Sequence, residues 1–166
     1  FGRYTRVAFI RNPYTRALSA YLDKIVTNQW ERARHLPRLG FMNGEHVSFR
    51  DFLLAVSKAS RLEVDIHFAC QTDLLMYKFI SFDFVGYFEC FDESLRLLAD
   101  LLLDESNFSE KKYAEFGKHH QTNSTNRLLE FYGPEEISLI QQIYAVDFTS
   151  LGYSFDIHQA QNPPNF

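Results

Sequence analysis

The sequence predicts a helix-rich α/β domain built on a short parallel sheet. Two apolar segments, residues 6–10 and 82–89, have the composition of strands, and most other apolar residues recur with the helical period. The 166 residues are 46% hydrophobic and include 17 Phe and 9 Tyr, which is enough for one aromatic core and too little for two. We therefore expect one domain over residues 1–158 and a loose tail over residues 159–166.

The first strand is predicted at "RVAFI", residues 6–10, because a short run of Val, Phe and Ile is typical of a strand buried on both faces. Asn12-Pro13 ends this strand, and Pro13 suits the first turn of a helix. An apolar residue recurs every three or four positions from Tyr14 to Ile25, which gives this helix one apolar stripe.

The middle of the chain is predicted to hold a long loop and two helices. Residues 28–46 contain two glycines and a proline and show no clear period, so we expect a loop of a length that is usually functional. Ser48 begins a helix, since Asp51 stands three residues later in the position of a capping box. A second apolar helix is expected from Ile66 to Phe79.

The last part of the chain is predicted to begin with the second strand. Residues 82–89 place Phe at alternate positions, which indicates a strand, and Asp92 is expected to cap a helix over residues 92–103. Residues 104–125 are polar and irregular. A final helix over residues 134–151 begins with proline and two acidic residues and keeps the helical period to its end.

Charge is distributed unevenly along the chain. Residues 1–38 carry eight basic and two acidic side chains, whereas residues 39–166 carry nine basic and nineteen acidic ones. This asymmetry predicts an anion site near the N-terminal end and argues against a surface that binds nucleic acid. The two cysteines and six histidines show no metal-ligand spacing, so we expect free thiols and no metal. No apolar run reaches the roughly 18 residues of a membrane span.

Arg11 stands between the first strand and the first helix. Open α/β sheets bind ligands at this place, and a guanidinium offers paired donors to phosphate oxygens. The amide groups and dipole of the helix N-terminus add positive potential, and Ser19 can present a hydroxyl to the same anion. The segment therefore predicts a phosphate site, the alternative being an arginine that is solvated or ion-paired.

Three segments of the chain contain motifs. In the first, Arg11-Asn12-Pro13 is followed by Arg16, Ser19, Tyr21 and Lys24. The other two segments are "DIHFACQTDLL" with the following "FDFVGYFECFDESLRLL", and "TNSTNRLLEFYGPEEISLIQQIYAVDFTSLGYS". In this order they resemble the family of PAPS-dependent carbohydrate sulfotransferases (sulfotransferase family 2), whose 3′-phosphate motif is R-[DN]-P-x-x-R-x-x-S-x-Y-x-x-K. The resemblance implies a P-loop-NTPase-like α/β fold and sulfuryl transfer from 3′-phosphoadenosine 5′-phosphosulfate (PAPS) to a hydroxyl of a carbohydrate.

The resemblance also implies which residues hold the donor. Arg11 and Ser19 would grip its 3′-phosphate, with Arg16 in the same motif. A later loop would close over the nucleotide with four polar side chains: Lys118, His120, Asn123 and Ser124.

Two residues are candidates for other roles at the site. His67 lies in the H-x-x-x-Q stretch and is the candidate catalytic base, the alternative being a histidine satisfied by hydrogen bonds in the core. Glu89 ends the second strand, and we expect it either to form an ion pair with Arg11 or Arg16 or to serve the site.

One part of the family pattern is missing. No Gly-rich turn with a lysine, which holds the 5′-phosphosulfate in the family, precedes Arg11. We therefore expect an N-terminally truncated, C-terminal portion that is inactive alone. The rival interpretations are a nucleotide-dependent, kinase-like enzyme of related fold and a non-catalytic helical interaction module. The expected acceptor is a carbohydrate or glycolipid, and the sparse cysteines favour a bacterial cytoplasmic location over the Golgi lumen.

Overall fold

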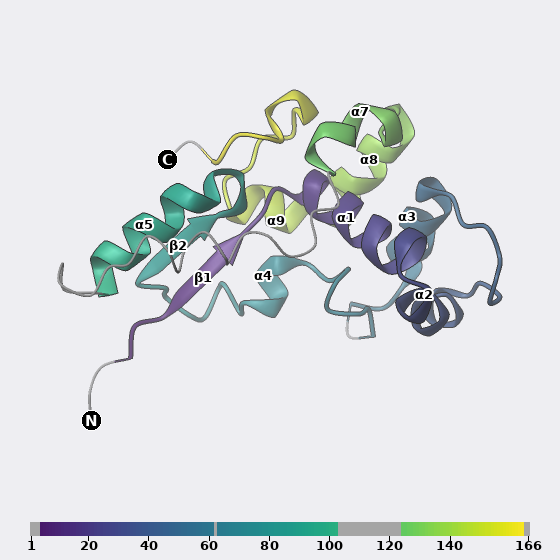
Figure 1. Cartoon of the computed structure of the whole chain (residues 1–166), viewed down its shortest axis with the longest axis horizontal. Helices are drawn as coiled ribbons and strands as arrows, with labels where there is room; N and C mark the ends of the chain where they lie inside the picture. The colour runs from purple at the N-terminus through teal and green to yellow at the C-terminus, as the bar shows by residue number, and fades with distance from the viewer. Residues whose placement is uncertain (1–3, 62, 103–123, 165–166) are drawn as a thin grey trace.

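The computed structural model describes residues 4–61, 63–102 and 124–164, which form a two-stranded parallel sheet and a larger number of helices (Figure 1). The main elements in chain order are β1 (Val7–Ile10), α1 (Pro13–Tyr21), the π-helix η1 (Leu22–Thr27), α2 (Gln29–His35), η2 (Pro37–Leu39), α3 (Phe49–Lys58), α4 (Gln71–Leu74), β2 (Phe84–Tyr87), η3 (Phe88–Cys90), α5 (Phe91–Leu102), η5 (Thr125–Arg127), α7 (Leu128–Phe131), α8 (Pro134–Ile143), α9 (Ala145–Ser150) and η6 (Ile157–Gln159). The prediction of a helix-rich α/β fold with a short parallel sheet is confirmed.

The sheet pairs β1 with β2 in parallel, so that Val7 lies opposite Phe84 and Ile10 opposite Tyr87. Gly86 is required here, because a Cβ at this position would lie 2.5 Å from the ring of Phe9. The sheet and α5 lie at one end of the elongated molecule, and α2, α3, α7 and α8 lie at the other (Figure 1). The β1–α1 junction therefore stands between the two parts.

The first helix forms where the sequence predicts it. The side chain of Asn12 accepts a hydrogen bond from the backbone N–H of Tyr14, and Pro13 occupies the first turn. The helix continues as η1 through Thr27, and its predicted stripe is buried, with Leu18 and Ile25 at most 1% exposed. The aromatic core is also confirmed: the ring of Tyr14 packs 5.1 Å from that of Phe148.

The predicted loop over residues 28–46 is wrong in its first part. Asn28 caps α2 by accepting hydrogen bonds from the backbone N–H groups of Trp30 and Glu31. Trp30 is 89% exposed, and within this helix only His35 is buried. A single buried residue leaves no apolar period, which is why the sequence pattern does not reveal this helix.

The predicted helix from Ile66 to Phe79 is also wrong, since only the four residues of α4 are helical there. Ile66 is 63% and Phe79 is 83% exposed, so these apolar side chains do not form a buried stripe. Met76 takes a positive φ of 48°, which a continuing right-handed helix does not allow.

Two helix boundaries differ from the prediction. Asp92 does not cap α5, because η3 runs directly into a helix that begins one residue earlier, at Phe91. The predicted helix over 134–151 is divided into α8 and α9 at Tyr144, where φ is −109° and ψ is 24°. The hydroxyl of Tyr144 donates to the carbonyl of Phe68, and the break turns α9 against α4. Of the predicted irregular segment, residues 104–123 lie outside the described part of the chain.

No helix in the described ranges combines the length and apolar character needed to cross a bilayer. In the C-terminal segment Ala160 is fully buried, whereas residues 161–163 are exposed.

Both cysteines are free thiols, as predicted. Cys70 is 8% exposed, and burial raises the pKa of its thiol to about 11. At pH 7.5 we expect Cys70 to react with iodoacetamide at least tenfold more slowly than an ordinary thiol, because the thiolate is the reactive form and the raised pKa leaves a smaller fraction of Cys70 ionised. Timed alkylation followed by peptide mass spectrometry measures this rate. Labelling of Cys70 as fast as that of the urea-unfolded chain would contradict the prediction.

Candidate functional site

Arg11 leaves the carboxyl end of β1 with its backbone held on both sides by one residue. Its backbone N–H donates to the side-chain oxygen of Gln71 over 2.9 Å, and the side-chain amide of Gln71 donates to its carbonyl over 2.7 Å. The guanidinium donates through Nε to the Thr15 hydroxyl (3.1 Å) and through Nη2 to the Ser124 hydroxyl (2.8 Å). Among the described residues, the hydrogen-bond partners of this cation are therefore neutral hydroxyls.

The electrostatics of Arg11 favour an anion. Burial lowers the pKa of its guanidinium, and the charge of Glu89 opposes this shift. The lowered pKa means that the protein surroundings stabilise the charged guanidinium less well than water does. A negatively charged ligand in contact with the guanidinium would supply the missing stabilisation.

Gln71 is held in place by a buried carboxylate on another helix. Asp147 of α9 is fully buried and accepts three hydrogen bonds from the first turn of α4: from the Gln71 N–H (2.8 Å), the Thr72 N–H (2.9 Å) and the Thr72 hydroxyl (2.7 Å). Asp147 thus caps α4, α4 carries Gln71, and Gln71 holds Arg11. Sequence reasoning missed this role, although an acid within the apolar stripe of the last helix is a signal for it.

Glu89 does not form the expected ion pair with Arg11 or Arg16. One carboxylate oxygen instead accepts the backbone N–H of Asn12 (2.7 Å), and the other accepts the Tyr153 hydroxyl (3.0 Å). Burial raises the pKa of Glu89. The Glu89 bonds join η3 to the start of α1, and together with the Asn12 cap they occupy the N–H groups of Asn12 and Tyr14. The helix dipole remains as a source of positive potential.

An open cleft of about 560 Å³ brings four of the predicted site residues together: Arg11, Arg16, Ser19 and His67. The first of these follows β1, the next two lie on α1, and His67 lies in the segment before α4. Arg16 ties this segment to α1, because its guanidinium donates to the carbonyls of Ala69 (2.7 Å) and Ile66 (3.1 Å).

Lys24, the last residue of the 3′-phosphate motif, also lines the cleft but is already paired. Its ammonium lies 2.9 Å from a carboxylate oxygen of Asp23 and 3.3 Å from one of Glu31. The arginines of the cleft contact neutral groups, whereas this lysine is neutralised. The positive charge open to a ligand is therefore that of Arg11 and Arg16.

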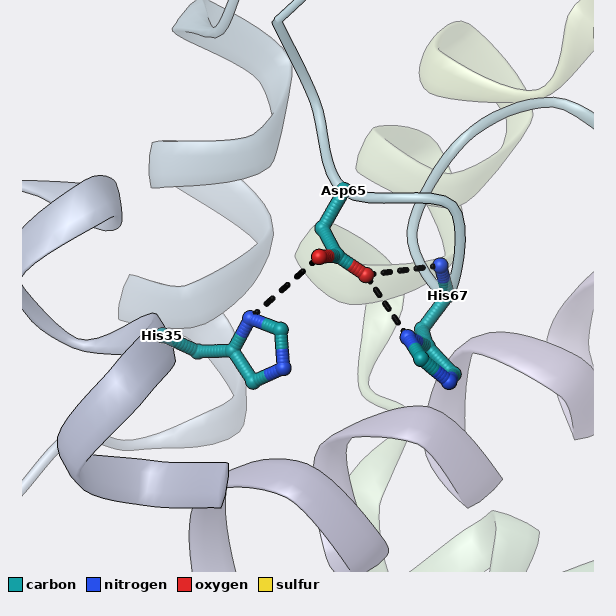
Figure 2. A group of neighbouring side chains, drawn as sticks. All are labelled: His35, Asp65 and His67. Carbon is teal, nitrogen blue, oxygen red and sulfur yellow. Dashed lines mark hydrogen bonds and ion pairs between the residues drawn. The ribbon is translucent and has the colours of Figure 1, made fainter. Parts of the chain in front are cut away.

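His67 is oriented by a neighbouring carboxylate. Its Nδ1 lies 2.6 Å from Oδ1 of Asp65, and its backbone N–H donates to the same oxygen over 3.0 Å (Figure 2). Because a carboxylate only accepts, this contact places the ring proton on Nδ1 and leaves the lone pair on Nε2. The side chain is 37% exposed, so this nitrogen suits a base in the cleft.

Of the predicted nucleotide loop, Ser124 alone lies in the described part of the chain, where it is buried and accepts the hydrogen bond from Arg11. Lys118, His120 and Asn123 lie outside the described residues.

Comparison with known proteins identifies the relatives of this chain. The sequence model described as "Sulfotransferase family" matches residues 1–154. The chain belongs to this family. It is 25% identical to Carbohydrate sulfotransferase 9 of Homo sapiens over 173 residues, which covers 91% of this chain and 38% of that protein. It is also 25% identical to Carbohydrate sulfotransferase 8 of Mus musculus over 169 residues, covering 91% of this chain and 40% of that protein.

The chain thus spans about two-fifths of the length of these curated relatives. No solved structure matches it significantly. Family membership confirms the resemblance drawn from the three motifs. In this sulfotransferase-family chain the motifs also contact one another, since Gln71 of the second motif lies between Arg11 of the first and Asp147 of the third.

Proposed function

We propose that this chain is the part of a sulfotransferase that binds the 3′-phosphate of PAPS, and that the whole protein transfers the sulfuryl group to a carbohydrate hydroxyl. The observation that carries the proposal is Arg11, a partly buried cation whose described hydrogen-bond partners are neutral and which lines one cleft with Arg16 and Ser19. Family membership favours this activity over a kinase-like enzyme or an interaction module.

The cleft suits a dianionic phosphate. Arg11 supplies a guanidinium fixed by Gln71, Thr15 and Ser124, so little side-chain entropy is lost when an anion binds. Arg16 adds a second positive charge, and Ser19 adds a hydroxyl from the next turn of α1. The acid of this cleft, Asp23, is paired with Lys24 and does not oppose the ligand strongly.

His67 is the proposed base of the transfer. Its Nε2 takes the proton of the acceptor hydroxyl as the acceptor oxygen bonds to sulfur and the bond from sulfur to the 5′-phosphate oxygen breaks. Asp65, at 2.6 Å from Nδ1, stabilises the imidazolium that this step forms. A carbohydrate acceptor is in keeping with the names of the relatives, Carbohydrate sulfotransferase 8 and 9.

Calorimetric titration of 3′-phosphoadenosine 5′-phosphate into this chain tests the proposal. We expect a dissociation constant between micromolar and millimolar, weakened at least tenfold by Arg11→Ala, which loses a charge-assisted contact of about 1.5–3 kcal/mol. Ser19→Ala should weaken binding a few-fold, and Arg50→Ala, on an exposed arginine paired with Glu135, should leave it unchanged.

Adenosine 5′-phosphate, which lacks the 3′-phosphate, is the matched ligand control. It should bind more weakly, and Arg11→Ala should change its affinity little. A folded chain that binds neither nucleotide would overturn the proposal, as would an Arg11→Ala variant that loses the same affinity for both.

A further inference from the structure

Three metal-ligand side chains meet beside the cleft. His35 ends α2, and Asp65 and His67 precede α4, so the residues come from segments about thirty positions apart (Figure 2). One nitrogen or oxygen atom of each lies within 4.8 Å of the corresponding atom of the other two. His35 is 1% exposed, whereas His67 is 37% exposed and gives access from solvent.

The buried ring of His35 leaves one nitrogen without a partner. Its Nε2 lies 3.1 Å from a carboxylate oxygen of Glu31, which only accepts, so the proton is on Nε2 and the lone pair is on Nδ1. Nδ1 has no hydrogen-bond partner among the described residues and lies 3.8 Å from Oδ2 of Asp65. Two acceptors therefore face each other in the interior with no donor between them.

We propose that one divalent transition-metal ion, of which Zn²⁺ is the representative, binds to His35 Nδ1, a carboxylate oxygen of Asp65 and His67 Nδ1. Two imidazoles and a carboxylate form a common ligand set for such ions. Glu31 stands behind His35 as a second carboxylate, an arrangement that fixes the tautomer of metal-binding histidines. The ion replaces the proton that now lies between His67 and Asp65, and this proton passes to solvent.

Two positive charges oppose the ion and set a limit on its affinity. Arg34 and Arg38 approach Oδ2 of Asp65 at 4.0 and 3.7 Å. Their side chains are 55% and 62% exposed, so both can turn toward water when an ion binds. Removing either charge should therefore strengthen metal binding, which a purely structural role of the cluster does not predict.

The ion also competes with the proposed base. When a metal takes Nδ1 of His67, the neutral ring carries its proton on Nε2 and has no lone pair for an acceptor hydroxyl. A bound metal ion would therefore inhibit the proposed transfer. The geometry that supports the metal site does not itself depend on the proposed function.

Titration of ZnCl₂ into the chelator-stripped chain at fixed pH, followed by calorimetry, tests the site. We expect one ion per chain, with Asp65→Asn and His67→Ala binding at least tenfold more weakly. Glu31→Gln should weaken binding 10- to 100-fold through His35. Arg38→Ala should tighten it several-fold, and His158→Ala, on an exposed histidine, should change nothing. Circular dichroism of each variant confirms that it is folded, and Co²⁺ absorbance reports the ligand geometry.

Two results would overturn the proposal. One is a folded chain that takes up no Zn²⁺ at millimolar concentration. The other is uptake that His67→Ala and Asp65→Asn leave unchanged, which would place the ion elsewhere on the surface.

Discussion

Replacing Asp147 by alanine is expected to lower the free energy of unfolding by about 3–5 kcal/mol. The substitution leaves the N–H groups of Gln71 and Thr72 and the Thr72 hydroxyl without their acceptor, in a place closed to water. Each unsatisfied buried donor costs about 1–3 kcal/mol. Urea unfolding followed by far-UV circular dichroism measures the loss.

The matched control is Asp100→Ala, which removes an exposed carboxylate near the end of α5. It should change the free energy of unfolding by less than about 0.5 kcal/mol. A loss below 1 kcal/mol for Asp147→Ala would show that α4 finds other acceptors, and that Asp147 is not what holds the segment carrying Gln71.

Local signals explain which elements could be predicted. The strand β1 and the helix α1 follow from an apolar run, Asn12-Pro13 and a regular apolar stripe, all within twenty residues. Ser48 caps α3 as its spacing to Asp51 predicts, through the bond from the Asp51 N–H. In each case the residues that form the element also contain the signal that starts it.

Tertiary contacts explain the elements that were missed or misplaced. The helix α2 buries only His35, so its residues show no stripe, and its cap depends on one asparagine. The segment from Ile66 to Phe79 has helical spacing but remains mostly turns. Its short helix α4 begins where Asp147, about 75 positions later, provides acceptors. No pattern inside the segment contains this information.

The candidate site also combines residues that a local motif predicts with residues that only the fold brings together. Arg11, Arg16 and Ser19 stand at fixed spacing in one motif, so the sequence alone could place them on one strand end and one helix. Of the partners that hold Arg11, Thr15 lies four residues away, whereas Gln71 and Ser124 lie 60 and 113 residues away. The cluster of His35, Asp65 and His67 was likewise invisible to a search for ligand spacing, because its members join two separate segments.

Gln71→Leu should separate the positioning of Arg11 from its charge. Leucine keeps most of the volume of glutamine but removes both hydrogen bonds to the backbone of Arg11, which are 2.9 and 2.7 Å long. We expect a loss of about 2–4 kcal/mol in the free energy of unfolding, because an N–H and a carbonyl are left unsatisfied near the core. If the 3′-phosphate binds Arg11, affinity for 3′-phosphoadenosine 5′-phosphate should also fall at least tenfold.

The two measurements have different meanings when they disagree. Urea unfolding reports the polar contacts of Gln71 whether or not the chain binds a nucleotide, whereas calorimetry reports the orientation of the guanidinium. Gln29→Leu, on an exposed glutamine of α2, is the control and should change neither quantity appreciably. A destabilised Gln71→Leu chain with unchanged nucleotide affinity would mean that Thr15 and Ser124 suffice to hold the arginine. The contacts from Asp147 through Gln71 would then stabilise the fold without contributing to nucleotide affinity.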